Sequence, residues 1–194
     1  VELRATQGNF PDFGGRLHWR HDRNLSGYNI LNMGIWYEAL MRWVGPASEV
    51  FAMTSVIVPE RLDGDDLMRQ VSVPDHVDVL CKIGTSIKAH LAFSAVTGLG
   101  SSGEVWLFGT DGTIHLDTAS MTLSGGRRGS DVLEKIQIPP QKEDFWRVEE
   151  EFINSICGLE PVRRTTFEDG VAYMEFTEAV TRSAQSRSSV SLPL

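Results

Sequence analysis

The feature of this sequence that most restricts its fold is a series of short segments, between residues 77 and 138, in which apolar and polar residues alternate. The clearest of them covers residues 86–96. One of its faces carries Ile87, Ala89, Leu91, Phe93 and Ala95, and the other carries Lys88, His90, Ala92 and Ser94. An alternation of period two predicts a half-buried strand, and the small, mixed residues on the second face indicate that this face is not simply a charged, solvated one.

Helices and further strands are predicted on both sides of this series. A helix over residues 27–44 has apolar residues at helical spacing, Ser26 as its expected N-cap and Gly45-Pro46 at its end. The charged residues 59–75 are predicted to form a loop with one helical turn. The predicted strands cover residues 1–9, 48–58, 77–83, 86–96, 103–109, 112–117, 120–124 and 132–138, with a short last strand at Val190 and Leu192.

Two more helices are predicted near the end of the chain. The first is indicated by an apolar stripe that ends at Gly158 and consists of Phe145, Val148, Phe152, Ile153 and Ile156. The second begins after Thr165 and Thr166, which together with Glu168 and Asp169 resemble a capping box. Its expected packing face is Ala172, Phe176, Ala179, Val180 and Ser183.

A run of strands followed by helices favours an α+β fold, with a large, mostly antiparallel or mixed sheet and helices packed on one face. The other face is then open, and either water or a second copy of the chain covers it. No internal repeat or linker interrupts the sequence, so residues 1–194 are predicted to form a single domain.

A glycine-rich segment, Gly98-Leu99-Gly100-Ser101-Ser102-Gly103, matches the G-x-G-x-x-G pattern of dinucleotide-binding proteins. That pattern binds a pyrophosphate only when a helix begins there and points its N-terminus at the phosphates. Here Glu104-Val105-Trp106-Leu107-Phe108 follows, which is a strand pattern. We therefore expect a strand-to-strand connection and no cofactor-binding residue in this chain.

Charge and composition exclude several classes of partner. The net charge of -8 argues against nucleic acid and against an anionic membrane surface, because both require basic surface. No apolar run approaches the roughly 18 to 20 residues that a membrane span needs. The two cysteines, Cys81 and Cys157, form neither a disulfide framework nor a zinc site, so no metal is expected and the cytoplasm is the simplest location.

The first residues indicate that the chain is part of a longer protein. Val1, Leu3 and Ala5 alternate with polar residues from the first position onward, without an initiator Met. A strand that begins at residue 1 is typical of a domain that continues from a preceding one.

Several motifs resemble the Gfo/Idh/MocA (glucose–fructose oxidoreductase/inositol dehydrogenase) family. They occur in the family's order and span nearly the whole chain: Trp19-Arg20, Leu25 to Trp36, Arg42-Trp43 with Gly45, Phe108 to Ile114, Glu151-Phe152 with Gly158 and Pro161, Glu168-Asp169-Gly170, and Ser183-Ala184. Each motif is weak alone, but the ordered set is fairly specific.

The resemblance implies a two-domain NAD(P)-dependent oxidoreductase that acts on a sugar, polyol or related hydroxy compound. A Rossmann domain with NAD or NADP and a catalytic Lys would precede Val1. The present chain would supply the substrate pocket and would form a homodimer through its open sheet face. Alone, it is expected to be inactive, because hydride transfer needs the nicotinamide beside the substrate.

The family's catalytic Asp and His lie four residues apart on a helix, and Asn32 and Trp36 occupy these positions here. Neither side chain is an acid or base at neutral pH, although the amide and the indole N–H can bind a hydroxyl. Three interpretations remain open. The base lies elsewhere, the protein binds a ligand without turnover, or the two residues simply pack against the missing domain.

Other residues near the predicted helix start are candidates for the pocket. Arg20 can bind a carboxylate or hydroxyls, or form a surface ion pair. Tyr28 and Asn29 replace family glycines and would narrow the pocket. His21 is the possible substitute base, with a solvated loop His as the alternative. His18 is more commonly a solvated loop histidine, and Glu38 is predicted to be structural. His90 and His115 are not expected to bind metal, because no carboxylate lies at ligand spacing.

Overall fold

The fold is centred on a nine-stranded sheet. A computed structural model describes residues 1–143 and 146–194. The strands are β1 (Glu2–Thr6), β2 (Ala47–Ser55), β5 (His76–Ile83), β6 (Ile87–Ser94), β7 (Glu104–Phe108), β8 (Gly112–Asp117), β9 (Thr122–Arg127), β10 (Glu134–Lys135) and β11 (Val190–Ser191), in the order β10-β9-β8-β7-β1-β6-β5-β2-β11. In the described part of this sheet, β1 and β6 are the only parallel neighbours.

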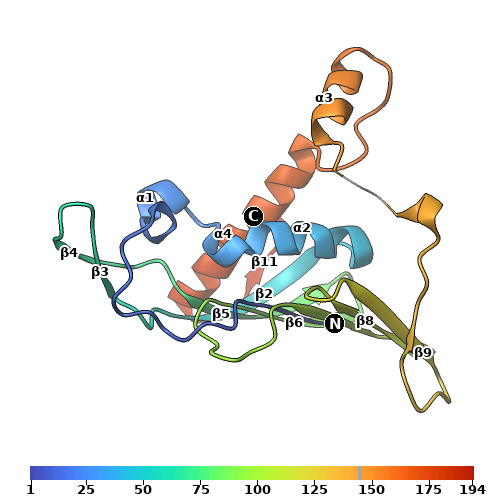
Figure 1. Ribbon diagram of the computed structural model, residues 1–194, viewed down its shortest axis with the longest axis horizontal. Coiled ribbons are helices and arrows are strands. Elements are labelled where there is room, and N and C mark those ends of the chain that lie inside the picture. The colour runs from blue at the N-terminus through green and yellow to red at the C-terminus, as the bar shows by residue number, and fades with distance from the viewer. Residues whose placement is uncertain (144–145) are drawn as a thin grey trace.

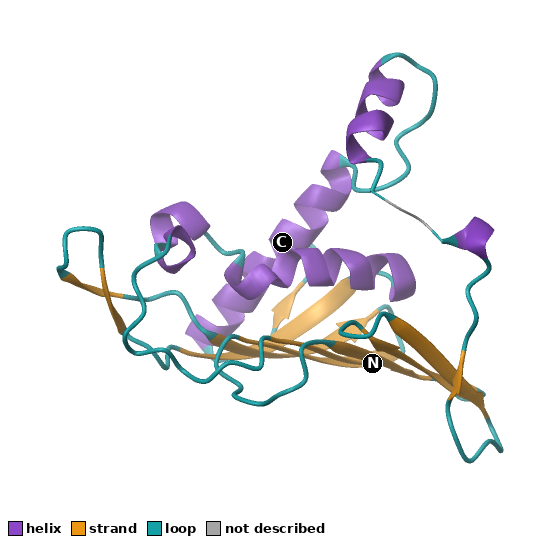
Figure 2. Ribbon diagram, in the orientation of Figure 1, coloured by secondary structure: helices purple, strands orange, loops and turns teal. Residues whose placement is uncertain are grey.

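The helices lie on one face of the sheet. They are α1 (Arg23–Ser26), α2 (Met33–Val44), α3 (Val148–Ile156) and α4 (Phe167–Ser186), with short 3-10 helices at Trp19–His21, Ile30–Asn32 and Pro140–Lys142. Figure 1 shows α2 and α4 above the sheet, and Figure 2 shows the opposite face without a helix. The α+β prediction is confirmed, and no second, nucleotide-binding fold occurs within the described residues.

The core lies between α2, α4 and the inward face of the sheet. Leu3, Val79 and Leu91 are fully buried in the central strands. Against them pack Tyr37 of α2 and Phe176 of α4, whose rings stack with centroids 3.6 Å apart and planes 6° from parallel. The buried Tyr37 hydroxyl accepts a hydrogen bond from Ala47 N–H (2.8 Å), so α2 is joined to the first residue of β2.

The glycine-rich segment 98–103 connects β6 to β7, as the sequence predicted. No helix begins there. Thr118 N–H donates to the Gly103 carbonyl (3.0 Å), which joins the end of this connection to the residue after β8. The segment therefore closes a strand connection and does not form a phosphate cradle.

The predicted helix over residues 27–44 is wrong in its first six residues. Ser26 is not its N-cap but the last residue of α1, and α2 begins at Met33. Between them, Gly27, Leu31 and Asn32 have positive φ. The helical pattern was misleading because Ile30 and Met33 both reach the core from either side of this kink.

Residues 59–75 also differ from the prediction. They form a two-stranded hairpin, β3 (Glu60–Leu62) and β4 (Met68–Gln70), and not a loop with a helical turn. The Asp63 carboxylate organises the turn by accepting the N–H groups of Asp65 and Leu67. Strands of three residues are too short for the alternation to be recognised.

Both C-terminal helices exist, but only the second one is buried. In α4, Thr166 and Asp169 form the predicted capping box, and Phe176, Ala179, Val180 and Ser183 are buried. In α3, no residue is buried, so its apolar stripe is not a packing face here. Phe145, which was assigned to that stripe, lies outside the described residues.

In residues 1–143 and 146–194, no helix is both long and apolar enough to cross a membrane.

The substitution Phe176→Ala is expected to lower the free energy of unfolding by about 3–5 kcal/mol, because it leaves a cavity beside Tyr37. The control is Phe167→Ala in the same helix, where the ring is 94% exposed and the change should stay within about 0.5 kcal/mol. Urea unfolding of both variants measures the difference. Equal destabilisation of the two would contradict a core built on the aromatic stack.

Candidate functional site

The candidate site lies where α2 begins, at the positions that matched the family motif. Leu31 (φ 52°, ψ 36°) and Asn32 (φ 59°, ψ 21°) are both left-handed. This conformation costs a residue with a side chain about 1–2 kcal/mol, and Asn tolerates it better than Leu. Such strain is concentrated at functional sites, which makes the start of α2 the strongest candidate.

Asn29 has a structural role that the sequence did not reveal. Its Oδ1 accepts a hydrogen bond from Gly34 N–H (3.0 Å), so Asn29 satisfies a free N–H in the first turn of α2. A Cβ at Gly34 would lie 3.0 Å from Asn29 Oδ1 and 3.2 Å from Tyr173 Cδ2. Gly34 therefore makes room for the capping side chain.

Asn32 precedes α2, but its side chain makes no capping hydrogen bond. The residue is exposed, and its amide forms no hydrogen bond with any described residue. Both its carbonyl oxygen and its NH2 group are therefore available to a ligand.

Trp36 lies one turn further along α2 and is half-buried against the core. A Cβ at Gly103 would lie 3.4 Å from Trp36 Cη2, so the indole fits over the glycine that precedes β7. Asn32 occupies the N-cap position of α2, four residues before Trp36. The start of α2 thus carries a free amide, and its first turns carry a flat, half-buried indole.

Glu38 is structural, as the sequence analysis expected. It is 8% exposed and forms an ion pair with Arg42. Thr165 at the start of the α4 region donates a hydrogen bond to the same carboxylate (2.9 Å). These contacts join the C-terminal part of α2 to the segment before α4.

His21 lies in the 3-10 helix Trp19–His21, where its Nδ1 accepts the N–H of His18 (3.0 Å). A neutral imidazole with an accepting Nδ1 carries its proton on Nε2, so the remaining nitrogen is a donor and not a base. Burial, then the charges of Arg61 and His18, lower the pKa of His21, against a smaller raising effect of Asp75. The ring is therefore neutral at pH 7.

The other two predicted pocket residues have local aromatic contacts. The Arg20 guanidinium lies 4.4 Å from the centre of the Trp19 ring, a cation–π contact. Tyr28 is 38% exposed, with the Arg23 guanidinium 5.9 Å from its ring centre. Within the described residues, no hydrogen bond or ion pair joins Arg20, His21 or Tyr28 to Asn32 or Trp36.

The strand histidines do have carboxylate neighbours, contrary to the sequence analysis. His90 Nε2 lies 3.2 Å from Asp78 Oδ1, and His115 Nε2 lies 3.4 Å from Glu104 Oε2. Strand pairing brings these residues together across 12 and 11 positions of sequence. Nevertheless, no group of three or more metal-ligating side chains suited to an ion occurs among the described residues.

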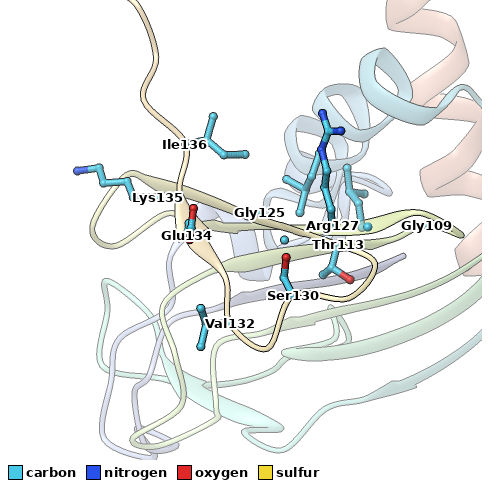
Figure 3. A pocket seen from close by; sticks show the side chains of 13 residues that line it. Gly109, Thr113, Gly125, Arg127, Ser130, Val132, Glu134, Lys135 and Ile136 are labelled. Atoms are coloured by element: carbon cyan, nitrogen blue, oxygen red, sulfur yellow. The ribbon is translucent and has the colours of Figure 1, made fainter.

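A hollow of about 760 Å³ lies elsewhere, over strands β7 to β10 (Figure 3). It is lined by Leu107, Gly109, Gly112, Thr113, Ile114, Gly125, Gly126, Arg127, Ser130, Val132, Glu134, Lys135 and Ile136. This hollow is open and consists largely of backbone and aliphatic surface. Four of these residues, Gly109, Gly112, Thr113 and Ile114, belong to the motif Phe108 to Ile114. None of the predicted substrate-binding residues lines the hollow, so the start of α2 remains the candidate site.

Comparison with known proteins agrees with the motifs. A family model described as the GFO/IDH/MocA C-terminal domain matches residues 1–115. No curated protein matches the chain in sequence.

Solved structures show the same fold. An NAD binding oxidoreductase from Klebsiella pneumoniae superposes with a TM-score of 0.82 at 19% identity, over 100% of this chain and 59% of that one. Levoglucosan dehydrogenase in complex with NADH and L-sorbose gives 0.83 at 20%, over 100% and 58%. The super-repressor mutant of Gal80p from Saccharomyces cerevisiae gives 0.70 at 13%, over 98% and 56%. The present chain thus spans less than two thirds of each of these proteins.

Replacement of Asn29 by Ala is expected to destabilise the protein by about 1 kcal/mol, because the Gly34 N–H loses its acceptor. Asn32→Gly is the matched variant. It should leave stability equal or slightly higher, because glycine adopts positive φ without strain. Thermal or urea unfolding of both variants checks the assignment. A larger loss from Asn32→Gly than from Asn29→Ala would show that Asn32 is the structural residue.

Proposed function

The chain belongs to the GFO/IDH/MocA family, as an oxidoreductase C-terminal domain, and on that premise we propose that it is the substrate-binding and dimerising half of an NAD(P)-dependent dehydrogenase. The proposed substrate is a sugar, a polyol or a related hydroxy compound. In the longer protein, a nucleotide-binding domain precedes Val1.

The observation that carries this proposal is the free amide of Asn32 at the start of α2, four residues before the half-buried Trp36 indole. A sugar presents hydroxyl groups around an apolar ring face. The Asn32 amide can donate to one hydroxyl and accept from another, and the indole provides the flat surface that a ring face packs on. Levoglucosan dehydrogenase, which has the same fold, is known in complex with NADH and L-sorbose, and this supports the choice of a sugar.

The proton acceptor must come from outside this pair. Oxidation of an alcohol removes the hydroxyl proton as the hydride leaves, and neither Asn32 nor Trp36 can take that proton. His21 presents a donor, because the His18 N–H occupies its Nδ1. We therefore assign the base to the preceding domain, in keeping with the catalytic Lys of the family.

An NAD(P) cofactor would accept the hydride, and the one segment that matched a nucleotide-binding pattern does not fit it. The glycine-rich segment 98–103 joins two strands, so it aims no helix N-terminus at a phosphate. In this proposal the preceding domain holds the cofactor, and this chain binds and orients the substrate.

The proposed dimer uses the outward face of the sheet. Because Val50, Ala52 and Val79 point to the core, their strand neighbours point outward. Those neighbours include Phe51, Met53 and Leu80, which are 38%, 69% and 58% exposed. Phe51 and Leu80 are cross-strand partners. An apolar patch of this kind on an uncovered sheet supports association with a second copy.

Leu80→Asp is expected to convert the dimer to a monomer, because it puts a charge in the middle of the patch. Leu99→Asp, in the exposed connection between β6 and β7, is the control and should leave the dimer intact. Light scattering of both variants measures the state. A dimer that is unaffected by Leu80→Asp would place the interface on another surface.

The second candidate function is a ligand-binding or dimerisation module without catalysis. It is favoured by one observation: the family's Asp and His positions hold Asn32 and Trp36, and neither is an acid or base. A similar fold also occurs in the Gal80p super-repressor mutant, although that likeness shows the fold alone.

An assay of the longer protein with NAD or NADP and a panel of sugars and polyols distinguishes the two functions. We expect turnover by the longer protein and none by residues 1–194 alone. Asn32→Gly should lower kcat/KM about 2- to 10-fold, which corresponds to one hydrogen bond, whereas Asn24→Ala on α1 should not.

Binding of NADH and a sugar without turnover would favour the non-catalytic module. Turnover by the isolated 194 residues would contradict the proposal that the preceding domain holds the cofactor and this chain binds the substrate.

A further inference from the structure

The glycine-rich connection between β6 and β7, residues 98–103, does not bind a nucleotide in the proposed function, but two of its glycines contact aromatic rings. A Cβ at Gly98 would lie only 2.6 Å from Phe10 Cγ. A Cβ at Gly103 would lie 3.4 Å from Trp36 Cη2 and 3.5 Å from Trp36 Cζ2. The connection therefore packs against aromatic side chains from two other parts of the chain, the loop after β1 and α2.

Gly103 occupies a space that admits no side chain without a displacement. The residue is buried, and a Cβ there would overlap Thr118 Oγ1. The Trp36 indole already lies at van der Waals distance from the same Cβ position. A side chain at residue 103 must therefore displace the Thr118 hydroxyl, the indole or both.

Thr118, the residue after β8, fixes the position of Gly103. The Gly103 carbonyl accepts two hydrogen bonds from it, one from the Thr118 N–H (3.0 Å) and one from Thr118 Oγ1 (3.0 Å). Next to them, Glu104 of β7 pairs with Asp117 of β8. The two hydrogen bonds thus extend the β7–β8 ladder by one position, to the place where the indole lies.

The rest of the connection is also held by hydrogen bonds. The Leu99 N–H donates to the Gly8 carbonyl (3.0 Å), and the Thr6 hydroxyl donates to the Ser101 carbonyl. The Ser101 hydroxyl in turn donates to Glu104 Oε1 (3.2 Å). A segment with three glycines would otherwise have large conformational freedom. These contacts give the indole a fixed support before any ligand binds.

We propose that Gly103 and Thr118 are positioning residues of the substrate site, which determine where the Trp36 indole lies and thereby the surface on which the ring face of a cyclic sugar packs. The inference rests on the proposed function. One substrate must bind the Asn32 amide and pack on the indole at the same time, so the place of the indole matters. The glycine-rich connection then serves the hydroxylated substrate.

The inference distinguishes two classes of substrate. A cyclic sugar presents an apolar ring face that packs on an indole. An open-chain polyol has no fixed ring face, so it depends mainly on hydrogen bonds to its hydroxyl groups. A displaced Trp36 indole therefore weakens the binding of cyclic sugars more than the binding of open-chain polyols.

NMR of the tryptophan indole N–H groups in the longer protein tests the placement. The Trp36 signal is assigned with Trp36→Phe, and we expect it to shift in Gly103→Ala. It should return in the double variant Gly103→Ala and Thr118→Ala, because loss of the Thr118 hydroxyl removes the overlap. Gly64→Ala is the control and should leave the signal unchanged, because a Cβ at Gly64 meets no atom within 4 Å.

Dissociation constants for the longer protein loaded with NADH test the link to the substrate. The probes are cyclic sugars and open-chain polyols, with D-glucose and D-glucitol among them. Gly103→Ala should weaken the binding of cyclic sugars about 2- to 10-fold, the size of one aromatic packing contact, and change that of polyols less. The double variant should restore it. A merely structural role would weaken both classes equally.

Thr118→Val is a milder second variant, since it leaves Gly103 in place and removes one of its two hydrogen bonds. We expect the same direction of change in the Trp36 signal and in sugar binding. Thr118→Ser keeps the hydroxyl and should behave like the wild type.

The outcomes separate this inference from the proposed function. If the Trp36 signal does not move in Gly103→Ala, or if both classes of ligand weaken equally, the inference fails. It also fails if only polyols bind. In these cases the proposed function stands as long as Asn32→Gly weakens binding. If neither cyclic sugars nor polyols bind to the wild-type protein, both fail.

Discussion

The stacked rings of Tyr37 and Phe176 hold the two long helices together over the sheet, and the position of the candidate site depends on them. The stack alone would fix only the distance between α2 and α4. The Tyr37 hydroxyl also fixes α2 relative to the sheet, because it accepts a hydrogen bond from the buried N–H of Ala47, the first residue of β2. Burial raises the pKa of Tyr37 to about 12, so the hydroxyl remains neutral. Trp36, the residue before Tyr37, lies over Gly103, which precedes β7.

The candidate site follows from how α2 begins. Asn29 and Gly34 close the first turn, so the helix does not need Asn32 as its cap. The Asn32 side-chain amide therefore forms no hydrogen bond with a described residue, and Trp36 lies over Gly103 at the edge of the core. The strain at Leu31 is the cost of this arrangement, and the burial of Ile30 and Met33 on either side offsets it.

The sequence predicted the fold well where the elements are long and half-buried. Strands β5 and β6 were recognised because eight residues of alternation leave little ambiguity, and α4 was recognised by its capping box. The start of α2 was not predicted correctly. The apolar residues keep helical spacing across the kink at Leu31 and Asn32, and the sequence does not show that these two residues have positive φ. The β3–β4 hairpin was too short. The apolar stripe of α3 was recognised, but none of the residues of this helix is buried among the described ones.

The surroundings of the candidate site residues were harder to predict than the strands. The motif identified Asn32 and Trp36, but spacing alone could not show that Asn29 is a cap or that the His18 N–H occupies His21 Nδ1. These hydrogen bonds join residues close together in a loop, and the same loop sequence is compatible with several conformations that form different hydrogen bonds. The cross-strand partners of His90 and His115 were missed because register depends on pairing and not on local spacing.

The most direct measurement is an NMR titration of the longer protein, loaded with NADH, with the sugars of the panel. Binding at the start of α2 predicts shifts of the Asn32 side-chain amide and of the Trp36 indole N–H. Unchanged signals from these two groups, together with shifts of the Gly112 and Gly125 amides in the hollow over β7 to β10, would contradict a substrate site at the start of α2.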